Sequence, residues 1–285
     1  SDYLLHMHDN AKDVQTEGIM VQDNNFDLER ALLAATGERR MSTPMPQQFP
    51  SVDEAYAIQR RIHARTGQPI MVWKLGLTGK APQDAFGAAE PTVGRLPSSA
   101  IFSDRSQIFA VVPEIYAEAE LVFEMGSDLP VVDRPYTRAD ICAALKGIYT
   151  GIEIVFSRFT DDHQSLPLLI ADNVNAYGLV LGGKLSSQWE DRFADMPAKL
   201  SRNDEAPVEG STARVLGNPL DAVVWLANWL RENENDNLKK EQLIASGTTT
   251  GATEIFAGDT ISVSFDGAPA ARISLIPSDE KDQSL

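Results

Sequence analysis

Two glutamates lie two positions apart in an otherwise apolar stretch of the chain. In residues 116–123, the alternation of a strand places Glu118 and Glu120 on one face and the alanine and leucine side chains on the other. Two carboxylates at this spacing can converge on one cation, and without a cation they repel each other. For this pair alone, the competing interpretation is an acidic strand face exposed to solvent, which is common in so acidic a protein.

A third glutamate and a lysine occur inside apolar runs. Glu153 lies in the run 148–156, where a buried carboxylate without a partner would cost several kcal/mol. With the first pair it would complete the oxygen ligand set that Mg²⁺ or Mn²⁺ prefers, and these strands offer no histidine or cysteine for zinc. Lys74 interrupts the run 70–77 and could carry a proton beside such a metal once burial lowers its pKa. The alternative for Lys74 is a buried structural ion pair with one glutamate.

Strands must hold these four side chains, and the hydrophobic pattern predicts where they are. Apolar or alternating runs predict strands at 70–77, 115–123, 148–156 and 177–181. Helices are predicted at 27–35, 51–66, 138–146 and 219–230. Asn218 caps the last of them, with Pro219 in its first turn. Residues 260–265 alternate before the turn residues Asp266 and Gly267, which predicts a hairpin at a half-exposed antiparallel edge.

No regular alternation of strands and helices is visible, so the pattern predicts a β-rich α+β fold with helices packed outside. We expect a flexible N-terminal lead-in at 1–25, an N-terminal helical segment at 26–68 and a catalytic β-rich domain at 69–285. The lead-in carries His6 and His8, a weak metal signal in a polar segment.

Composition restricts the partners of the protein. The 285 residues carry a formal net charge of -16, which argues against nucleic acid and against an acidic membrane surface. No apolar run approaches the roughly 20 residues that cross a bilayer, and the first residues lack the order of a secretory signal. We therefore expect a cytoplasmic enzyme with a small-molecule substrate.

Seven short motifs in a fixed order resemble the hydratase and decarboxylase branch of the fumarylacetoacetate hydrolase superfamily, which acts on 2-hydroxydienoates. The motifs are DEAYAIQ (53–59), KLGLT (74–78), EAE (118–120), EIVFSR (153–158), ADN (171–173), GNPL (217–220) and AGD (257–259). Each motif is weak alone, but their order over most of the chain is specific.

The resemblance implies a rolled mixed β-sheet with outer helices, a homo-oligomer, and a role for each matching residue. The implied ligands of Mg²⁺ or Mn²⁺ are Glu118, Glu120 and Glu153, and Lys74 is the implied active-site lysine. The residues implied to contact the substrate are Ser157, Arg158, Asp172, Asn173, Ser246, Gly247 and Thr248. For Arg158, a bidentate grip on a substrate carboxylate and an ordinary arginine beside acidic residues remain equal alternatives.

One catalytic position departs from the resemblance. Hydratases of this branch carry an aspartate within a Pro-Asp-aromatic-Gly stretch, whereas this chain has Thr92 at that position, between Pro91 and Gly94. Threonine cannot act as a carboxylate base, and decarboxylases of the branch tend to have an apolar residue there. The feature that separates the two activities is therefore ambiguous in this chain.

The resemblance implies a reaction on a small 2-oxo or 2-hydroxydienoate acid in which a metal stabilises the electron-rich intermediate. We expect a hydratase of the 2-keto-4-pentenoate type, which gives a 4-hydroxy-2-oxo acid. The first alternative is a decarboxylase of a 2-oxo-3-enedioate, as for 4-oxalocrotonate. Further alternatives are an acylpyruvate-type carbon-carbon hydrolase, for which no His-Glu pair stands out, and a non-catalytic partner subunit of a hydratase-decarboxylase complex.

Overall fold

The computed structural model describes residues 27–38, 43–160, 165–268 and 271–278. The predicted lead-in at 1–25, with His6 and His8, lies outside them. Within the described residues, no helix combines the length and the apolar character needed to cross a bilayer.

Thirteen strands and six α-helices make up the described part of the chain. The α-helices are α1 (Leu28–Glu38), α2 (Val52–Ala64), α3 (Lys80–Phe86), α4 (Arg138–Ala144), α5 (Leu166–Ala171) and α6 (Pro219–Asn233). The first strands are β1 (Val72–Gly76), β2 (Thr92–Leu96), β3 (Ile101–Ser103), β4 (Gln107–Ala110), β5 (Ile115–Met125), β6 (Leu145–Val155) and β7 (Ala176–Ser186). The later strands are β8 (Pro197–Arg202), β9 (Val208–Ser211), β10 (Leu243–Thr248), β11 (Thr253–Ile255), β12 (Thr260–Phe265) and β13 (Ala271–Pro277).

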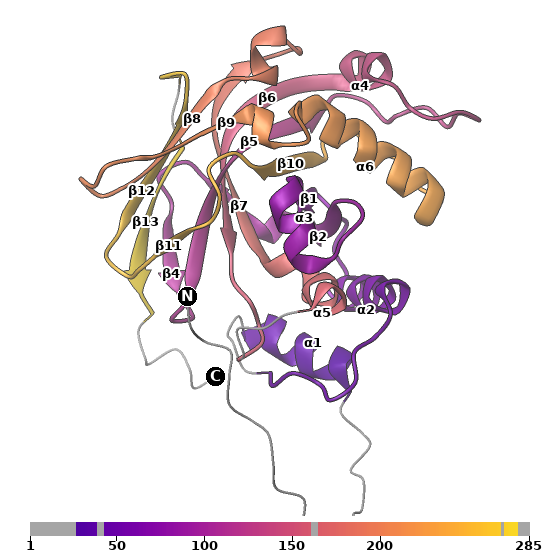
Figure 1. Cartoon of the computed structure of the whole chain (residues 1–285), viewed down its shortest axis with the longest axis vertical. Helices are drawn as coiled ribbons and strands as arrows, with labels where there is room; N and C mark the ends of the chain where they lie inside the picture. Colours follow the sequence, from indigo (N-terminus) through magenta and orange to yellow (C-terminus); the bar gives the residue numbers. More distant parts are fainter. Residues whose placement is uncertain (1–26, 39–42, 161–164, 269–270, 279–285) are drawn as a thin grey trace, which may run out of the picture.

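The strands form two mixed sheets. An eight-stranded sheet has the order β2-β1-β10-β5-β6-β7-β3, with β11 added to β5, and a five-stranded sheet has the order β4-β13-β12-β8-β9. Most neighbours are antiparallel, but β1 pairs with β10, β3 with β7 and β4 with β13 in parallel. The larger sheet curls, and the five-stranded sheet covers one side of it (Figure 1). This arrangement confirms the predicted α+β class with a rolled mixed sheet.

Helices cover the curled sheet on its other sides. In Figure 1, α1, α2 and α5 lie together below β1 and β2, and α6 extends beside β10. The buried face of α6 carries the predicted stripe of Leu220, Val223, Ala227 and Leu230. Burial of each leucine and valine side chain contributes about 1.5–3 kcal/mol, so this stripe fixes α6 against the sheet. The division at residue 68 stays a prediction, and α2 contacts both α5 and β2.

Local sequence signals account for most element boundaries. Asn218 accepts a hydrogen bond from the backbone N–H of Leu220, and α6 begins there as predicted. Asp266 and Gly267 both have positive φ, of 47° and 69°, as a tight hairpin between β12 and β13 requires.

Two predictions about strand placement were wrong. The 260–265 strand is not an edge, because β8 pairs with its free side and makes β12 the central strand of its sheet. The helix predicted at 138–146 ends earlier and the strand predicted at 148–156 begins earlier, because α4 ends at Ala144 and β6 begins at once with Leu145, paired to Met125. Both errors concern long-range pairing, which alternation along one strand does not specify.

Candidate functional site

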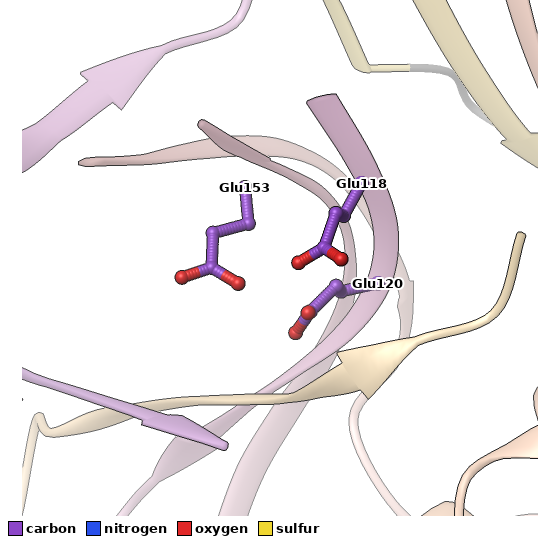
Figure 2. A group of neighbouring side chains, drawn as sticks. All are labelled: Glu118, Glu120 and Glu153. Atoms are coloured by element: carbon purple, nitrogen blue, oxygen red, sulfur yellow. The ribbon is translucent and has the colours of Figure 1, made fainter. Parts of the chain in front are cut away.

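Three glutamates meet on one face of the curled sheet. The antiparallel register of β5 and β6 places Glu118 directly opposite Glu153, and Glu120 follows two residues along the same face. Carboxylate oxygens of all three lie within 4.8 Å of one another. In Figure 2 the carboxylates of Glu118 and Glu120, both on β5, point toward that of Glu153. The predicted convergence is confirmed.

Burial makes this cluster unfavourable without a counter-charge. Glu120 and Glu153 are 0% and 1% exposed, and Glu120 Oε1 and both oxygens of Glu153 have no hydrogen-bond donor among the described residues. Burial, followed by the charge of Glu118, raises the pKa of Glu120 to about 7. Burial also raises the pKa of Glu153 well above its ordinary value, although Lys74 opposes this shift. Like charges opposite each other on a sheet are destabilising, so the cluster calls for a cation.

The donor set fits a divalent metal such as Mg²⁺ or Mn²⁺. All three groups offer hard oxygen ligands, and one carboxylate oxygen of each lies close enough to the others to share a cation. Zinc sites usually contain histidine or cysteine, and this cluster has neither.

A glycine on β10 holds the Glu120 carboxylate in position. The backbone N–H of Gly247 donates a hydrogen bond of 2.9 Å to Glu120 Oε2, and Gly247 adopts φ +121°. A Cβ at this position would collide with the side chain of Thr78. Ser246 donates its hydroxyl to the carbonyl of Leu121 at 2.9 Å, which ties β10 to β5. Gly247 and Ser246 therefore position the ligand strand.

Lys74 lies beside the glutamates, on β1. Its Nζ is 3.5 Å from Glu153 Oε2 and donates a hydrogen bond of 2.8 Å to the carbonyl of Val174. Burial alone would lower the pKa of Lys74, but the three glutamates outweigh burial and raise it. The prediction that burial lowers the pKa of Lys74 was therefore wrong for the protein without a metal, because that prediction left out the charges of the three glutamates.

The carbonyl that holds Lys74 belongs to an unusual backbone segment. Asn173, Val174 and Asn175 all have positive φ, of 55°, 55° and 59°. This region disfavours L-residues, especially a β-branched valine. The side chain of Asn173 compensates, because it accepts from the N–H of Arg95 and donates to the carbonyl of Arg95, both at 2.9 Å.

A cavity of about 580 Å³ reaches the glutamate cluster at Glu118. Of the predicted site residues, Lys74, Glu118 and Thr248 line it, whereas Glu120 and Glu153 are buried below its surface. Val174, Asn175 and Arg214 also contribute to the wall.

The predicted substrate contacts at 157–158 and 172–173 do not line this cavity. Arg158 is 6% exposed and pairs with Asp172, with Nη1 to Oδ1 at 3.0 Å and the Arg158 N–H to Oδ2 at 2.8 Å. The same guanidinium donates to the carbonyl of Ala176 at 2.8 Å, and Ser157 lies 3.5 Å from Asp172. These bonds join the end of β6 to the segment before β7. The geometry therefore favours a structural ion pair for Arg158 over a grip on substrate.

Thr92 also lies outside the cavity wall. It is 2% exposed on β2, opposite Gly76, and its hydroxyl has no hydrogen-bond partner among the described residues. A Cβ on Gly76 would meet both Thr92 and Val174. Thr92 therefore lies behind the part of the wall that Gly76 and Val174 form. A catalytic role for Thr92 stays a prediction.

Sequence reasoning missed Val174, Asn175 and Arg214. Asparagine tolerates positive φ, so two asparagines around one valine were a usable sign of a left-handed turn. Arg214 gave no such sign, because only folding brings its turn to the cavity.

Comparison with known proteins places the chain in a family. The profile of the fumarylacetoacetate (FAA) hydrolase C-terminal family matches residues 71–275. The 2-keto-4-pentenoate hydratase of Paraburkholderia xenovorans (strain LB400) is 30% identical over 261 residues, covering 89% of this chain and 95% of the relative. The 4-oxalocrotonate decarboxylase of Pseudomonas putida is 27% identical over 246 residues, covering 84% and 90%.

Solved structures share the fold. The 4-oxalocrotonate decarboxylase from Pseudomonas putida G7, complexed with magnesium and adipate, has a TM-score of 0.78 at 24% identity. Its complex with calcium and acetate has a TM-score of 0.79 at 25% identity. Each match covers 87% of this chain and 96% of the solved one. The motifs, the curled sheet and the family match agree, and this chain belongs to the fumarylacetoacetate hydrolase family.

Proposed function

We propose that the chain is a divalent-metal-dependent lyase, with Mg²⁺ or Mn²⁺ held by Glu118, Glu120 and Glu153, and that it hydrates a 2-hydroxy-2,4-dienoate. The observation that carries the proposal is the cluster of three carboxylates beside Lys74, two of them buried, at a cavity large enough for a small acid. The hydratase relative at 30% identity supports the same reaction class.

The chain's own residues supply positioning and proton transfer. When bound, the divalent cation would supply the Lewis acidity that draws electrons from a 2-oxo acid. Lys74, held by the Val174 carbonyl and Glu153, is placed to move a proton at the reacting end of the substrate. Asn175 lines the cavity, and its buried Oδ1 has no donor among the described residues, so it can accept a hydrogen bond from the substrate.

The direct test is turnover of a 2-hydroxydienoate. Purified protein with Mg²⁺ should consume 2-hydroxypenta-2,4-dienoate, followed by the loss of its ultraviolet absorbance, and should yield a 4-hydroxy-2-oxo acid. A chelator should stop the reaction and excess Mg²⁺ should restore it. If neither this monoacid nor a 2-hydroxydienoate that ends in a second carboxylate is consumed with Mg²⁺ or Mn²⁺, the hydratase proposal fails.

A decarboxylase is the second candidate, and one observation favours it. Among the described residues that line the cavity, Glu118 is the only acidic side chain, and it belongs to the proposed metal ligands. Water addition benefits from a free general base, typically by a factor of about 10² to 10⁴, whereas loss of carbon dioxide does not need one. Release of carbon dioxide from a 2-oxo-3-enedioate, faster than hydration of the dienoate, would place the decarboxylase first.

The remaining alternatives have less support. A hydrolase of the acylpyruvate type would need a histidine near the metal, but His63, the one histidine among the described residues, lies on α2 and contacts the carbonyl of Gln68. A non-catalytic partner subunit would bind the metal without turning over either substrate. Homo-oligomeric assembly is part of the proposal, and light scattering of the purified protein tests it.

A further inference from the structure

Arg214 is a cationic side chain in the cavity wall that has no ionic partner among the described residues. It is exposed, and no carboxylate of the described residues lies within ion-pair distance of it, whereas Lys74, the other cation of the wall, is paired with Glu153. The unpaired charge is therefore available to a ligand in the cavity.

The backbone that carries Arg214 is firmly anchored. Thr212 and Val215, on either side of it, are both fully buried, and the Thr212 hydroxyl accepts a hydrogen bond of 2.7 Å from the N–H of Met196. The N–H of Leu216 donates to the carbonyl of Thr78 at 2.9 Å, which ties this turn to the loop after β1. Lys74 lies on β1, so the turn that carries Arg214 is held at a fixed position relative to Lys74.

We propose that Arg214 binds a second carboxylate of the substrate, so that the enzyme prefers dicarboxylates, namely 2-oxo or 2-hydroxydienoates that end in a carboxylate. This rests on the proposed function for the reacting end of the substrate. The buried glutamates would hold the metal for one end, and Arg214, at the solvent-exposed part of the same cavity, would receive the other.

The rest of the wall suits the carbon chain of such an acid. Phe86 from α3 and Leu169 from α5 present apolar surface to the cavity. The apolar tail of a monocarboxylate would leave the guanidinium unpaired, whereas the second carboxylate of a diacid can accept two parallel N–H bonds from it. The guanidinium therefore distinguishes a diacid from a monoacid of similar length.

Binding of unreactive probes tests the inference apart from catalysis. Isothermal titration of the protein in Mg²⁺ should show adipate binding at least about tenfold more tightly than hexanoate, which has the same number of carbons. Arg214→Gln should weaken adipate about tenfold and leave hexanoate within about twofold. Arg214→Lys should retain part of the preference, because it keeps the charge but not the bidentate geometry.

The control is Arg202→Gln, which makes the same change of charge on β8, where Arg202 pairs with Glu205. It should leave both affinities unchanged. Equal loss of adipate affinity in both arginine variants would mean a long-range charge effect and would overturn the inference, as would an unchanged preference in Arg214→Gln. Turnover separates the two proposals. If Arg214→Gln loses the preference for adipate, but the parent protein consumes neither monoacid nor diacid dienoates, the diacid site is supported and the lyase proposal is refuted.

Discussion

The three glutamates have opposite effects on stability and on metal binding. Buried carboxylates that face one another destabilise the folded protein when no cation is present, and the same geometry creates affinity for one. Glu120 is the clearest case, because it is fully buried and only one of its oxygens receives a hydrogen bond, from Gly247.

Glu120→Gln should therefore separate folding from metal binding. The variant should bind Mn²⁺ at least about 100-fold more weakly, because it loses a charged ligand without changing shape. At pH 8, where the Glu120 carboxyl is ionised, it should also unfold at a higher temperature than the parent when both are metal-free, because one buried charge is removed. Metal titration and thermal unfolding measure the two effects.

Glu124→Gln is the matched control on the same strand. Glu124 pairs with Lys146 and Tyr149 and lies outside the ligand cluster, so its substitution should leave metal affinity unchanged. If both variants lose affinity equally, Glu120 is not a specific ligand.

The stability of the metal-free protein should fall as pH rises from about 5 to 8. The pKa of Glu120 is raised from its ordinary 4.5 to about 7, so between these values the folded state keeps a proton that the unfolded chain has released. Stability from this group is thus complete below pH 4.5 and is lost as pH rises through about 7.

Excess Mg²⁺ should reverse the trend, since it binds the deprotonated carboxylates. Thermal unfolding at pH 5.5 and pH 8 should show stabilisation by Mg²⁺ that is larger at pH 8 by about 3 °C or more. Equal stabilisation at both values would contradict the assignment of protons to this cluster.

At the scale of elements, the segment 173–175 transmits the position of β2 to Lys74. Asn173 clamps the backbone of Arg95, and the next carbonyl, that of Val174, receives the Lys74 ammonium. Strained backbone of this kind persists only where the surrounding contacts enforce it. We therefore infer that the substrate-binding role predicted for Asn173 is better described as positioning.

Asn173→Gly and Asn173→Ala separate the clamp from the backbone conformation. Both variants lose the two hydrogen bonds to Arg95. Only alanine adds the free-energy cost of a Cβ at positive φ, so Asn173→Ala should be less stable than Asn173→Gly by about 1 kcal/mol. Both should lower kcat while Mn²⁺ affinity stays within about twofold, because no metal ligand is touched. Unchanged kcat in a folded Asn173→Gly protein would refute the positioning role.

On β10, Gly247 should resist any side chain. Gly247→Ala adds a Cβ that collides with Thr78 and is strained at φ +121°, so we expect a loss of roughly 2 kcal/mol or more and weaker metal binding through displaced Glu120. Gly258→Ala is the control, because it has φ +99° and no neighbour within 4 Å. Urea unfolding should show a smaller loss in the control, and its metal affinity should stay unchanged.

At the scale of the whole molecule, close contact between the two sheets supports the curl that gathers the glutamates. Gly182 on β7 faces Ala271 on β13, and a Cβ at Gly182 would lie 2.6 Å from the Cβ of Ala271. This glycine lets the five-stranded sheet approach the curled one closely.

Gly182→Ala should wedge the sheets apart and cost about 1–3 kcal/mol of unfolding free energy. Adding Ala271→Gly should recover part of that loss, and a double-mutant cycle in urea measures the coupling. Additive losses with no coupling would show that the two positions do not press on each other.

The sequence by itself determined the local facts. Period-2 alternation put Glu118 and Glu120 on one face, and apolar surroundings implied that Glu153 and Lys74 are buried. Cap and turn residues located the start of α6 and the final hairpin, whereas α3 and α5 were not predicted. These signals act between residues close in the chain, where spacing alone fixes geometry.

Only the tertiary structure decided what lies around the metal site. It paired β12 with β8, enclosed Arg158 with Asp172, bent 173–175 toward Lys74 and brought Arg214 to the cavity wall. Each depends on contacts between residues distant in the chain, whose partners are chosen by sheet register and packing. Local spacing carries no record of that choice, so it pointed to the three glutamates proposed as metal ligands but not to the wall that would select a substrate.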